Sequence, residues 1–239
     1  MKPRVLVTGG SRGIGRATCL RLAEDGWEPL VHYKERAEDA RAVAEASGGQ
    51  LCPFGADLRN TGDIDRLWEW ANEPDALVNN AGVYVALPFD TPDRGAFEDA
   101  WRASFETNFA AAVRLTRRFV EAGKPGKVLM VASRVGFKGE AGAAHYAASK
   151  AAMISLVRSL SVELAPKGIG IFGIAPGWVD TAMARSGMEE REPEILASIP
   201  LGRMATPEDC AAAVAFLLRD ESAYLSGEVI DINGASYFH

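Results

Sequence analysis

Three side chains in the second half of the chain could together move a proton. Ser133 precedes Tyr146 by thirteen residues, and Lys150 follows that tyrosine by four. Residues four apart lie one turn from each other on one face of a helix, so an ammonium at Lys150 would stand beside the phenol. A free phenol has a pKa of about 10, and a neighbouring cation lowers such a pKa by roughly 1–3 units. The spacing predicts an acidic tyrosine that protonates a substrate oxygen, which the Ser133 hydroxyl polarises.

Each of these residues also has an ordinary structural interpretation. Ser133 could cap the end of a strand, and Tyr146 could pack in the core. Asn108, inside an expected helix, could satisfy backbone groups as a buried amide, because asparagine is a poor helix former. Their occurrence together and in order favours a catalytic site. His145 would lie about 100° around the helix from Tyr146, so we expect it at the pocket rim or the helix start.

A glycine-rich segment near the start of the chain could bind phosphate. It reads Thr8-Gly-Gly-Ser-Arg-Gly-Ile-Gly15 and follows a short apolar run. Glycines permit a tight turn and let a pyrophosphate approach the backbone, and the free amides of the following helix would hold it. Any tight turn needs glycine, so its place between strand and helix is what favours a nucleotide. The candidate cofactor ligands here are Gly9, Ser11, Arg12, Gly13, Ile14 and Gly15.

The end of the second apolar run indicates which dinucleotide would bind. Enzymes that use NAD usually place an acidic residue there to bond the ribose hydroxyls. Here Tyr33 takes that place and Lys34 follows, while Glu35 is expected to point outward and cap the next helix. Lys34 and Arg12 favour a 2′-phosphate, and hence NADP(H) rather than NAD. The alternative is that both are solvated surface charges.

Short apolar runs alternate with amphipathic stretches from end to end. This alternation is typical of an α/β fold of the Rossmann type, with a doubly wound parallel sheet between helices. No linker, repeat or low-complexity segment divides the chain, so we expect one domain over residues 1–239. The expected strands are Val5–Thr8, Pro29–Tyr33, Leu51–Gly55, Ala76–Asn79, Lys127–Ala132, Gly170–Ile174 and Glu228–Ile232. The expected helices are Gly13–Asp25, Ala37–Ser47, Ile64–Ala71, Phe97–Glu121, Tyr146–Ala165 and Pro207–Leu218.

The segment 179–206 lacks clear periodicity. Long segments of this kind in compact domains are often active-site lids, and we expect a substrate lid here. Its charged stretch from Glu189 to Glu194 would also suit a solvated surface helix.

Composition excludes several other classes of protein. A net charge of −6 and a pI near 5.2 argue against a nucleic-acid partner. Cys19, Cys52 and Cys210 have neither disulfide nor metal-ligand spacing, so we expect no metal and read each as a small buried apolar residue. No apolar run approaches the roughly 18 residues of a membrane span, and a strand begins too early for a signal peptide. We expect a cytoplasmic protein.

In combination, these motifs identify the chain as resembling the classical short-chain dehydrogenase/reductase family over nearly its whole length. The matching marks are Thr8-Gly-x-x-x-Gly-x-Gly15, Asp57-Leu58, Asn79-Asn-Ala-Gly82, Asn108, Ser133, Tyr146-x-x-x-Lys150 and Pro176-Gly-x-x-x-Thr181. The resemblance implies a seven-stranded sheet in the order 3-2-1-4-5-6-7 and a homotetramer.

The resemblance also implies roles for individual residues. Asp57 would meet the adenine, Lys150 would bond the nicotinamide ribose, and Asn108 would hold a water that links the lysine to solvent. Asn108, Ser133, Tyr146 and Lys150 would then be the catalytic set. The further cofactor residues would be Leu58, Asn80, Ala81, Gly82, Pro176, Gly177, Val179 and Thr181.

Within the family, the chain is most similar to bacterial 3-oxoacyl-[acyl carrier protein] reductases. The supporting segments are Pro200-Leu-Gly-Arg203, Ala213-Val-Ala-Phe-Leu217 and Tyr224-Leu-Ser-Gly-Glu228. This similarity implies reduction of a 3-oxoacyl thioester, with Lys124 and Lys167 at the places where basic residues dock the acidic carrier protein. A short-chain dehydrogenase of another alcohol (a sugar, a steroid, a polyketide or a 3-hydroxyacyl-CoA) would share many of these residues, and a non-catalytic NADP(H)-binding regulator is a further alternative.

Four residues are candidates for the substrate pocket. Tyr84, Trp178 and Met183 could bind an acyl chain or a ring, or could belong to the core. Arg134 could bind an anionic substrate group if it faces the pocket. Because neighbours at a strand end alternate between faces, a cofactor-side or surface position is the competing expectation for Arg134.

Overall fold

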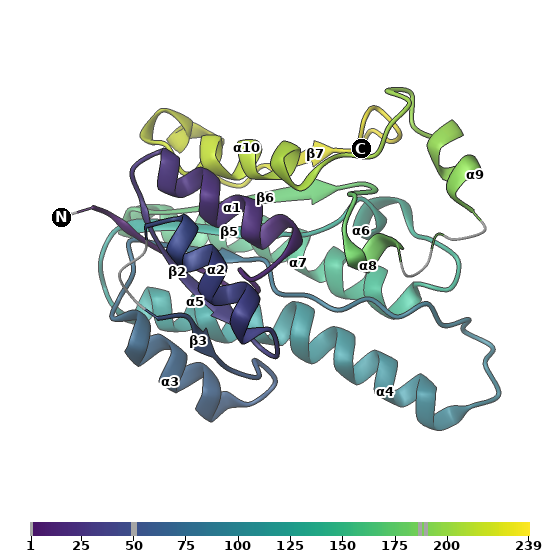
Figure 1. Ribbon diagram of the computed structural model, residues 1–239, viewed down its shortest axis with the longest axis horizontal. Coiled ribbons are helices and arrows are strands. Elements are labelled where there is room, and N and C mark those ends of the chain that lie inside the picture. The colour runs from purple at the N-terminus through teal and green to yellow at the C-terminus, as the bar shows by residue number, and fades with distance from the viewer. Residues whose placement is uncertain (1, 49–51, 186–187, 189–190) are drawn as a thin grey trace.

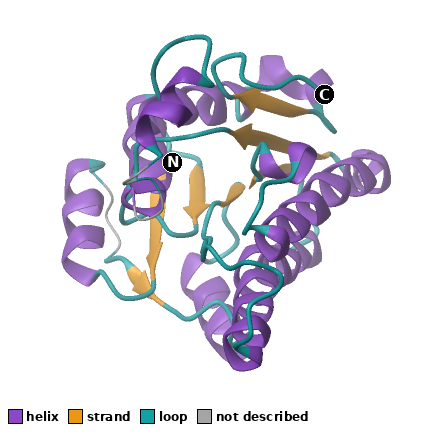
Figure 2. Cartoon of the chain, turned by 90° about the vertical axis from the view of Figure 1, so that its right-hand side faces the viewer, coloured by secondary structure: helices purple, strands orange, loops and turns teal. Residues whose placement is uncertain are grey.

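The strands, drawn in orange in Figure 2, form one parallel sheet. Their order is β3-β2-β1-β4-β5-β6-β7, which confirms the predicted fold class and strand order. The computed structural model describes residues 2–48, 52–185, 188 and 191–239. The strands are β1 (Arg4–Val7), β2 (Glu28–Tyr33), β3 (Phe54–Gly55), β4 (Ala76–Asn79), β5 (Gly126–Val131), β6 (Ile169–Pro176) and β7 (Val229–Ile232). Of the predicted strand Leu51–Gly55, the structure shows Phe54–Gly55, and Leu51 lies outside the described residues.

Successive side chains of a strand pack in two separate hydrophobic cores, one on each face of the sheet. Leu6 packs in one core, whereas its neighbours Val5 and Val7 pack in the other. All three side chains are fully buried, as expected for a strand that is covered on both faces. The same alternation continues through residues 76–78 of β4 and 128–131 of β5, which explains why these stretches are continuously apolar.

Helices cover the two faces of the sheet (Figure 1). One face carries α1 (Gly13–Glu24), α2 (Ala37–Ala46) and α10 (Pro207–Leu217); the other carries α3 (Thr61–Ala71), α5 (Ala111–Glu121) and α7 (Ala144–Leu164). Shorter helices are α6 (Val135–Lys138), α8 (Ala182–Arg185) and α9 (Glu192–Ala197), and 3₁₀ turns lie at Ala165–Lys167 and Asp220–Leu225.

The expected single helix Phe97–Glu121 is interrupted. It begins earlier, as α4 (Arg94–Ser104), because the Asp93 side chain accepts a hydrogen bond from Ala96 N at 2.9 Å. A π-helix, Phe105–Ala110, then joins α4 to α5. Such wide turns are rare and often mark functional sites. Asn108 lies in this turn and is fully buried.

The segment 179–206 leaves the sheet and returns to it. Asp180 N donates to Ala205 O at 2.9 Å, and Val179 and Ala205 form a parallel bridge at its base. Between them lie α8 and α9, while residues 186–187 and 189–190 fall outside the described part. Described side chains form a small apolar cluster, Met188, Ile195 and Ile199 with Trp178 packed against it. The segment therefore has a small core of its own next to the sheet.

Two cysteines are buried and one is not. Cys19 and Cys210 are fully buried, but Cys52 is exposed, so the expectation that all three are buried was wrong. Cys52 directly follows the undescribed residues and precedes Pro53 at the surface. Among the described residues, no group of His, Cys, Asp or Glu side chains is arranged to hold a metal ion. In the same part of the chain, no helix is long and apolar enough to cross a membrane.

A buried histidine connects β2, the glycine-rich loop and the chain after β3. His32 is 2% exposed, its Nδ1 accepts a hydrogen bond from Gly9 N at 3.0 Å, and its Nε2 lies 3.1 Å from Ala56 O. Because one nitrogen must accept and the other donate, this arrangement needs the neutral ring. Burial lowers the pKa of His32 from 6.5 to about 4. These contacts join residues far apart in the chain, so no local sequence pattern predicts them.

The buried histidine predicts a stability loss in acid. Between the unfolded pKa of 6.5 and the folded value of about 4, the unfolded chain binds a proton that the folded chain does not. The stabilisation is therefore complete above pH 6.5 and is lost as the pH falls through 4. Between pH 7 and pH 4, we expect wild type to lose roughly 3 kcal/mol more free energy of unfolding than His32→Gln, whose amide does not titrate. Urea titrations at each pH, read by tryptophan fluorescence, would measure the free energy of unfolding of both proteins. An equal loss between pH 7 and pH 4 in the two proteins would contradict the assignment.

Candidate active site

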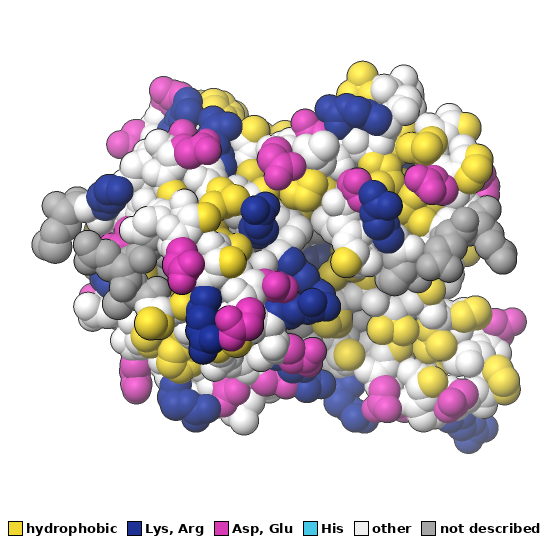
Figure 3. All heavy atoms as spheres, viewed as in Figure 1, with side chains coloured by type: hydrophobic (Ala, Val, Ile, Leu, Met, Phe, Trp, Pro, Cys, Tyr) yellow, Lys and Arg dark blue, Asp and Glu magenta, His cyan; other side chains and the backbone are white. Residues whose placement is uncertain are grey.

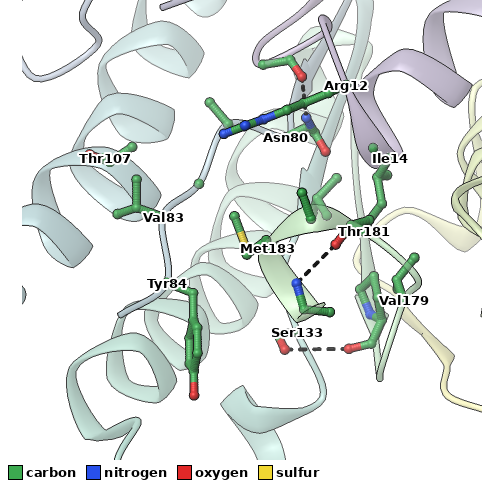
Figure 4. A pocket seen from close by; sticks show the side chains of 18 of the residues that line it. Arg12, Ile14, Asn80, Val83, Tyr84, Thr107, Ser133, Val179, Thr181 and Met183 are labelled. Carbon is green, nitrogen blue, oxygen red and sulfur yellow. Dashed lines mark hydrogen bonds between the residues drawn. The ribbon is translucent and has the colours of Figure 1, made fainter. Parts of the chain in front are cut away.

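A long cleft runs along the carboxyl ends of the strands. Its volume is about 810 Å³, and Figure 3 shows it as a hollow with Lys and Arg side chains gathered at one edge. In Figure 4, Arg12 and Asn80 lie toward one end, and Tyr84 and Ser133 toward the other. All the predicted site residues line this cleft except Gly15 and Asn108, which lie behind its wall.

The glycine-rich loop is held against the end of β4. The Thr8 hydroxyl accepts hydrogen bonds from Asn80 N at 2.9 Å and Ala81 N at 3.0 Å, and Asn80 Nδ2 donates to Thr8 O at 2.8 Å. A Cβ on Gly15 would lie 2.2 Å from Gly9 O, so no larger residue fits there. Gly15 thus shapes the loop from behind without reaching the cleft.

The start of α1 suits an anion. The N-cap residue of α1 is Arg12, and its side chain makes no capping hydrogen bond. The first backbone amides of the helix therefore have no side-chain acceptor from this residue. Ser11, Gly13 and Ile14 line the cleft beside them. These donors and the helix dipole fit the pyrophosphate of a dinucleotide, which this loop would hold.

Charged side chains surround the far end of the cleft, beyond Tyr33. Four are cations and two are carboxylates: Arg12, Lys34, Arg36 and Arg59, with Glu35 and Asp57. Sequence analysis missed Arg36 and Arg59, although Arg59 follows the expected adenine contact by only two residues.

Two expectations for this end require correction. Glu35 does not cap α2: the N-cap is Arg36, and Glu35 lines the cleft, 3.5 Å from Lys34 Nζ. Glu35 therefore places a carboxylate beside Lys34 in the cleft, whereas the sequence interpretation had it pointing outward. Asp57 is bound by Arg59 Nε at 3.0 Å and lies 3.5 Å from Lys34, and the Arg59 hydrogen bond holds its pKa well below the usual range.

The other wall comes from the end of β6. Pro176, Gly177 and Val179 line the cleft, and a Cβ on Gly177 would lie 3.0 Å from Asn233 Cβ. Thr181 lies opposite the glycine-rich loop, since a Cβ on Gly13 would be 3.2 Å from its Cγ2. The Thr181 hydroxyl accepts from Ala184 N at 3.3 Å (Figure 4) and so begins α8.

Tyr146 and Lys150 lie one turn apart on α7, as their spacing predicted. Lys150 is 3% exposed, its Nζ donates to Val131 O at 2.7 Å, and it lies 5.7 Å from the centroid of the Tyr146 ring. Burial lowers the pKa of Lys150 from 10.5 to about 7. The amine thus joins the catalytic helix to the end of β5, beside Ser133.

The predicted fall in the Tyr146 pKa does not occur in the protein alone. Burial raises the pKa of the phenol from 10 to about 12, and the interaction with the Ser133 hydroxyl opposes that rise. The expectation considered the lysine charge and omitted the desolvation of both groups. Placing two ionisable groups in one buried pocket favours their neutral forms.

Ser133 and Asn108 lie on either side of this pair. The Ser133 hydroxyl lies 3.5 Å from Pro176 O and 3.4 Å from Val135 N, at the end of β5. The Asn108 side chain bonds both backbone groups of Val83, with its Oδ1 accepting from Val83 N at 2.8 Å. A Cβ on Gly82 would lie 3.3 Å from Asn108 Oδ1 and 3.7 Å from Lys150 Nζ, so glycine keeps the space between these polar groups open.

The substrate candidates lie along the cleft. Tyr84 packs edge-on against Tyr146, with ring centroids 5.2 Å apart, and Met183 lines the middle of the cleft, between Val83 and Thr181 in Figure 4. Trp178 both lines the cleft and packs on the core of the segment 179–206. Arg134 also lines the cleft but is 6% exposed, which excludes the surface position considered for it. Its Nη1 donates to Ser236 Oγ at 3.0 Å.

Of the two positions expected for His145, the structure shows the start of α7 and not the pocket rim. It is 2% exposed, and its Nδ1 lies 2.8 Å from Ser104 Oγ, at the last residue of α4. This hydrogen bond joins the start of α7 to the end of α4, next to the π-helix that contains Asn108.

Comparisons with known proteins agree with this architecture. Residues 9–235 match the family model described as Enoyl-(Acyl carrier protein) reductase. The chain is 34% identical over 239 residues to the 3-oxoacyl-[acyl-carrier-protein] reductase FabG of Escherichia coli K12, covering 97% of this chain and 96% of that protein. It is 34% identical over 246 residues to the acetoacetyl-CoA reductase of Allochromatium vinosum, covering 98% of each.

A solved structure shows the same fold. A crystal structure from Sinorhizobium meliloti 1021, of a protein assigned by name to the short-chain alcohol dehydrogenases, superposes with a TM-score of 0.87 at 29% identity. The match covers 98% of this chain and 96% of the other. The fold, the full-length relatives and the ordered motifs agree: this chain belongs to the short-chain dehydrogenase/reductase family, whose oxidoreductases use a nicotinamide cofactor.

Proposed function

We propose that the protein is an NADPH-dependent carbonyl reductase that transfers a hydride to a ketone, with a 3-oxoacyl thioester as its substrate. The main support is that Ser133 and Tyr146 lie at one end of the dinucleotide cleft, with the Lys150 amine beneath them. Two hydroxyls at that end suit a carbonyl oxygen, which gains negative charge as it is reduced. The 3-oxoacyl-[acyl-carrier-protein] and acetoacetyl-CoA reductases among the relatives support the thioester.

Each residue of the site has a task in this reaction. When bound, the nicotinamide would supply the hydride and, once oxidised, would carry a positive charge. The Ser133 hydroxyl orients and polarises the carbonyl, and Tyr146 donates its proton to the oxygen. Lys150 holds the catalytic helix to β5 and, when protonated, stabilises the phenolate. The Asn108 amide and the space beside Gly82 suit a water that returns the proton to Lys150.

The choice of NADP rests on the charges around Tyr33. Arginine and lysine outnumber carboxylates at that end, and a phosphate binds such cations by charge-assisted hydrogen bonds. Asp57 forms ion pairs with Lys34 and Arg59, and Glu35 forms an ion pair with Lys34, so the charges of these two cations are partly neutralised. Arg12, from the glycine-rich loop, and Arg36, at the start of α2, add positive charge to the lining of the cleft.

Carrier docking, assembly and lid movement are further parts of the proposal. Lys167 ends a 3₁₀ turn and is exposed, while Lys124 pairs with Asp75 at 3.6 Å and also contacts Glu73 O. Lys167 is therefore the freer candidate for an acidic carrier protein. We propose a cytoplasmic homotetramer in which the segment 179–206 closes over the substrate.

Three other functions are separated by experiment. A dehydrogenase of a sugar, a steroid or another alcohol would prefer the corresponding carbonyl compound in a panel with NADPH. An enoyl reductase, as the family model is described, would reduce a carbon–carbon double bond in the same panel. A regulator would bind NADPH and oxidise none of it, although a pure binding protein has no need of Ser133, Tyr146 and Lys150 together.

The proton donor is tested by Tyr146→Phe. We expect the kcat for acetoacetyl-CoA to fall by roughly 10²–10⁴, the contribution of a positioned acid, while the Kd for NADPH stays within about threefold. Initial rates and fluorescence titration measure the two quantities. Tyr224→Phe is a matched control, because that ring is fully exposed and remote from the cleft. Retained turnover in Tyr146→Phe would remove the assignment.

Cofactor preference is tested by Lys34→Asp combined with Arg12→Ala. Loss of two charged contacts to the 2′-phosphate should lower the NADPH/NADH ratio of kcat/KM by roughly tenfold to a thousandfold. Arg41→Ala is the control, since Arg41 pairs with Glu38 on α2 and does not line the cleft. A ratio that stays the same in the double variant would show that other residues read the phosphate.

A further inference from the structure

A set of charges joins the loop after Ser133 to the segment 179–206. Glu140 lies between two guanidinium groups: its Oε2 is 3.8 Å from Nη2 of Arg134, and its Oε1 is 3.9 Å from Nη1 of Arg191. The side chains of Arg134 and Glu140 are 7% and 17% exposed, whereas that of Arg191 is 52% exposed. We call Arg134, Glu140 and Arg191 the Arg–Glu–Arg cluster.

Arg134 is the buried end of the cluster. Its Nη1 donates to the neutral Ser236 hydroxyl, and its Nε is buried with no hydrogen-bond partner in the described part of the chain. A buried guanidinium is costly unless a carboxylate faces it. Glu140 supplies that carboxylate, so its position is set from the protein interior.

Glu140 also faces the substrate end of the cleft. It lines the cleft together with Tyr84 and Tyr146. Burial is the main cause of the raised pKa of both phenols, and the Glu140 charge adds to each rise. Arg191 acts on Tyr84 in the opposite direction. The cluster therefore lies within electrostatic reach of both rings, beside the proposed carbonyl position.

Arg191 is the exposed end of the cluster and belongs to the lid candidate. It is the N-cap of α9, so an attraction on its side chain acts on the start of that helix. From α9, Ile195 packs in the small apolar cluster that also contacts Trp178, a residue of the cleft wall. Over the residues that the structure describes, the other carboxylate that pairs with Arg191 is that of Glu194, at 3.9 Å and 79% exposed, on the same helix. Pairing with Glu194 cannot join α9 to the rest of the protein, whereas pairing with Glu140 does.

We propose that Glu140 is a positioning residue: anchored by Arg134 next to Ser133, it holds α9 at the substrate end of the cleft by pairing with Arg191. This inference rests on the proposed function, because closure has its effect on the bound carbonyl compound. Loss of the carboxylate should weaken substrate binding more than the chemical step. NADPH binding should be spared, since the Arg–Glu–Arg cluster lies at the opposite end of the cleft from Arg12 and Arg59.

The test compares Glu140→Gln with Glu194→Gln, two identical changes in carboxylates that both lie 3.9 Å from Arg191. For each variant, initial rates give KM and kcat with acetoacetyl-CoA, and fluorescence titration gives the Kd for NADPH. Hydrogen exchange of the peptide 192–199 in the NADPH complex gives the opening of α9 without any need for turnover. Arg191→Gln and the double variant Glu140→Gln/Arg191→Gln complete a cycle.

For Glu140→Gln we expect a KM about threefold to tenfold higher, with a smaller change in kcat and faster exchange over 192–199. Arg191→Gln should reproduce these changes, and the double variant should add little to either. Glu194→Gln should leave KM and exchange as in wild type. Unchanged KM and exchange in Glu140→Gln, or equal effects of the two glutamate variants, would overturn the proposal. If wild type reduces no ketone, the proposed function fails, while exchange still decides whether Glu140 holds α9.

Discussion

The hydrogen bond from the Lys150 amine to the carbonyl of Val131 is the contact on which the site depends. It joins α7, which carries Tyr146, to the end of β5, which leads into Ser133. The bond is buried, so the amine keeps its place only while helix and strand stay together. The same burial that makes this contact precise disfavours charge on both Lys150 and Tyr146. Burial therefore sets both the position of the two side chains and their preference for the neutral form.

The two ends of the cleft are built by different means. At the phosphate end, backbone amides, Gly15 and the Thr8 hydroxyl define a rigid loop, and His32 fixes it to β2. At the substrate end, side chains from separate elements meet, and several of their contacts are long ion pairs. Rigid backbone suits a cofactor of constant shape, whereas adjustable side chains suit selection among carbonyl compounds. Membership of the family therefore predicts the structure of the phosphate end of the cleft better than that of the substrate end.

Sequence reasoning reached most of the fold because buried parallel strands are continuously apolar and glycine loops have a fixed local shape. It also placed Tyr146 and Lys150 correctly, since a spacing of four is a property of one helix. It missed Arg59, Glu140 and the bonds of His32, because those contacts join residues brought together only by the sheet. It misjudged the Tyr146 pKa because desolvation depends on the whole pocket and not on the neighbouring residue.

Ultraviolet difference titration of the Tyr146 phenol tests the central claim most directly. The signal is the wild-type spectrum minus that of Tyr146→Phe, recorded with and without saturating NADP⁺. Without cofactor, the phenol should stay protonated well above its ordinary pKa of 10, in accord with a value of about 12. With NADP⁺ bound, the added positive charge should lower that pKa. A phenol that ionises near pH 10 in the free protein, or at the same pH in both states, would contradict the account.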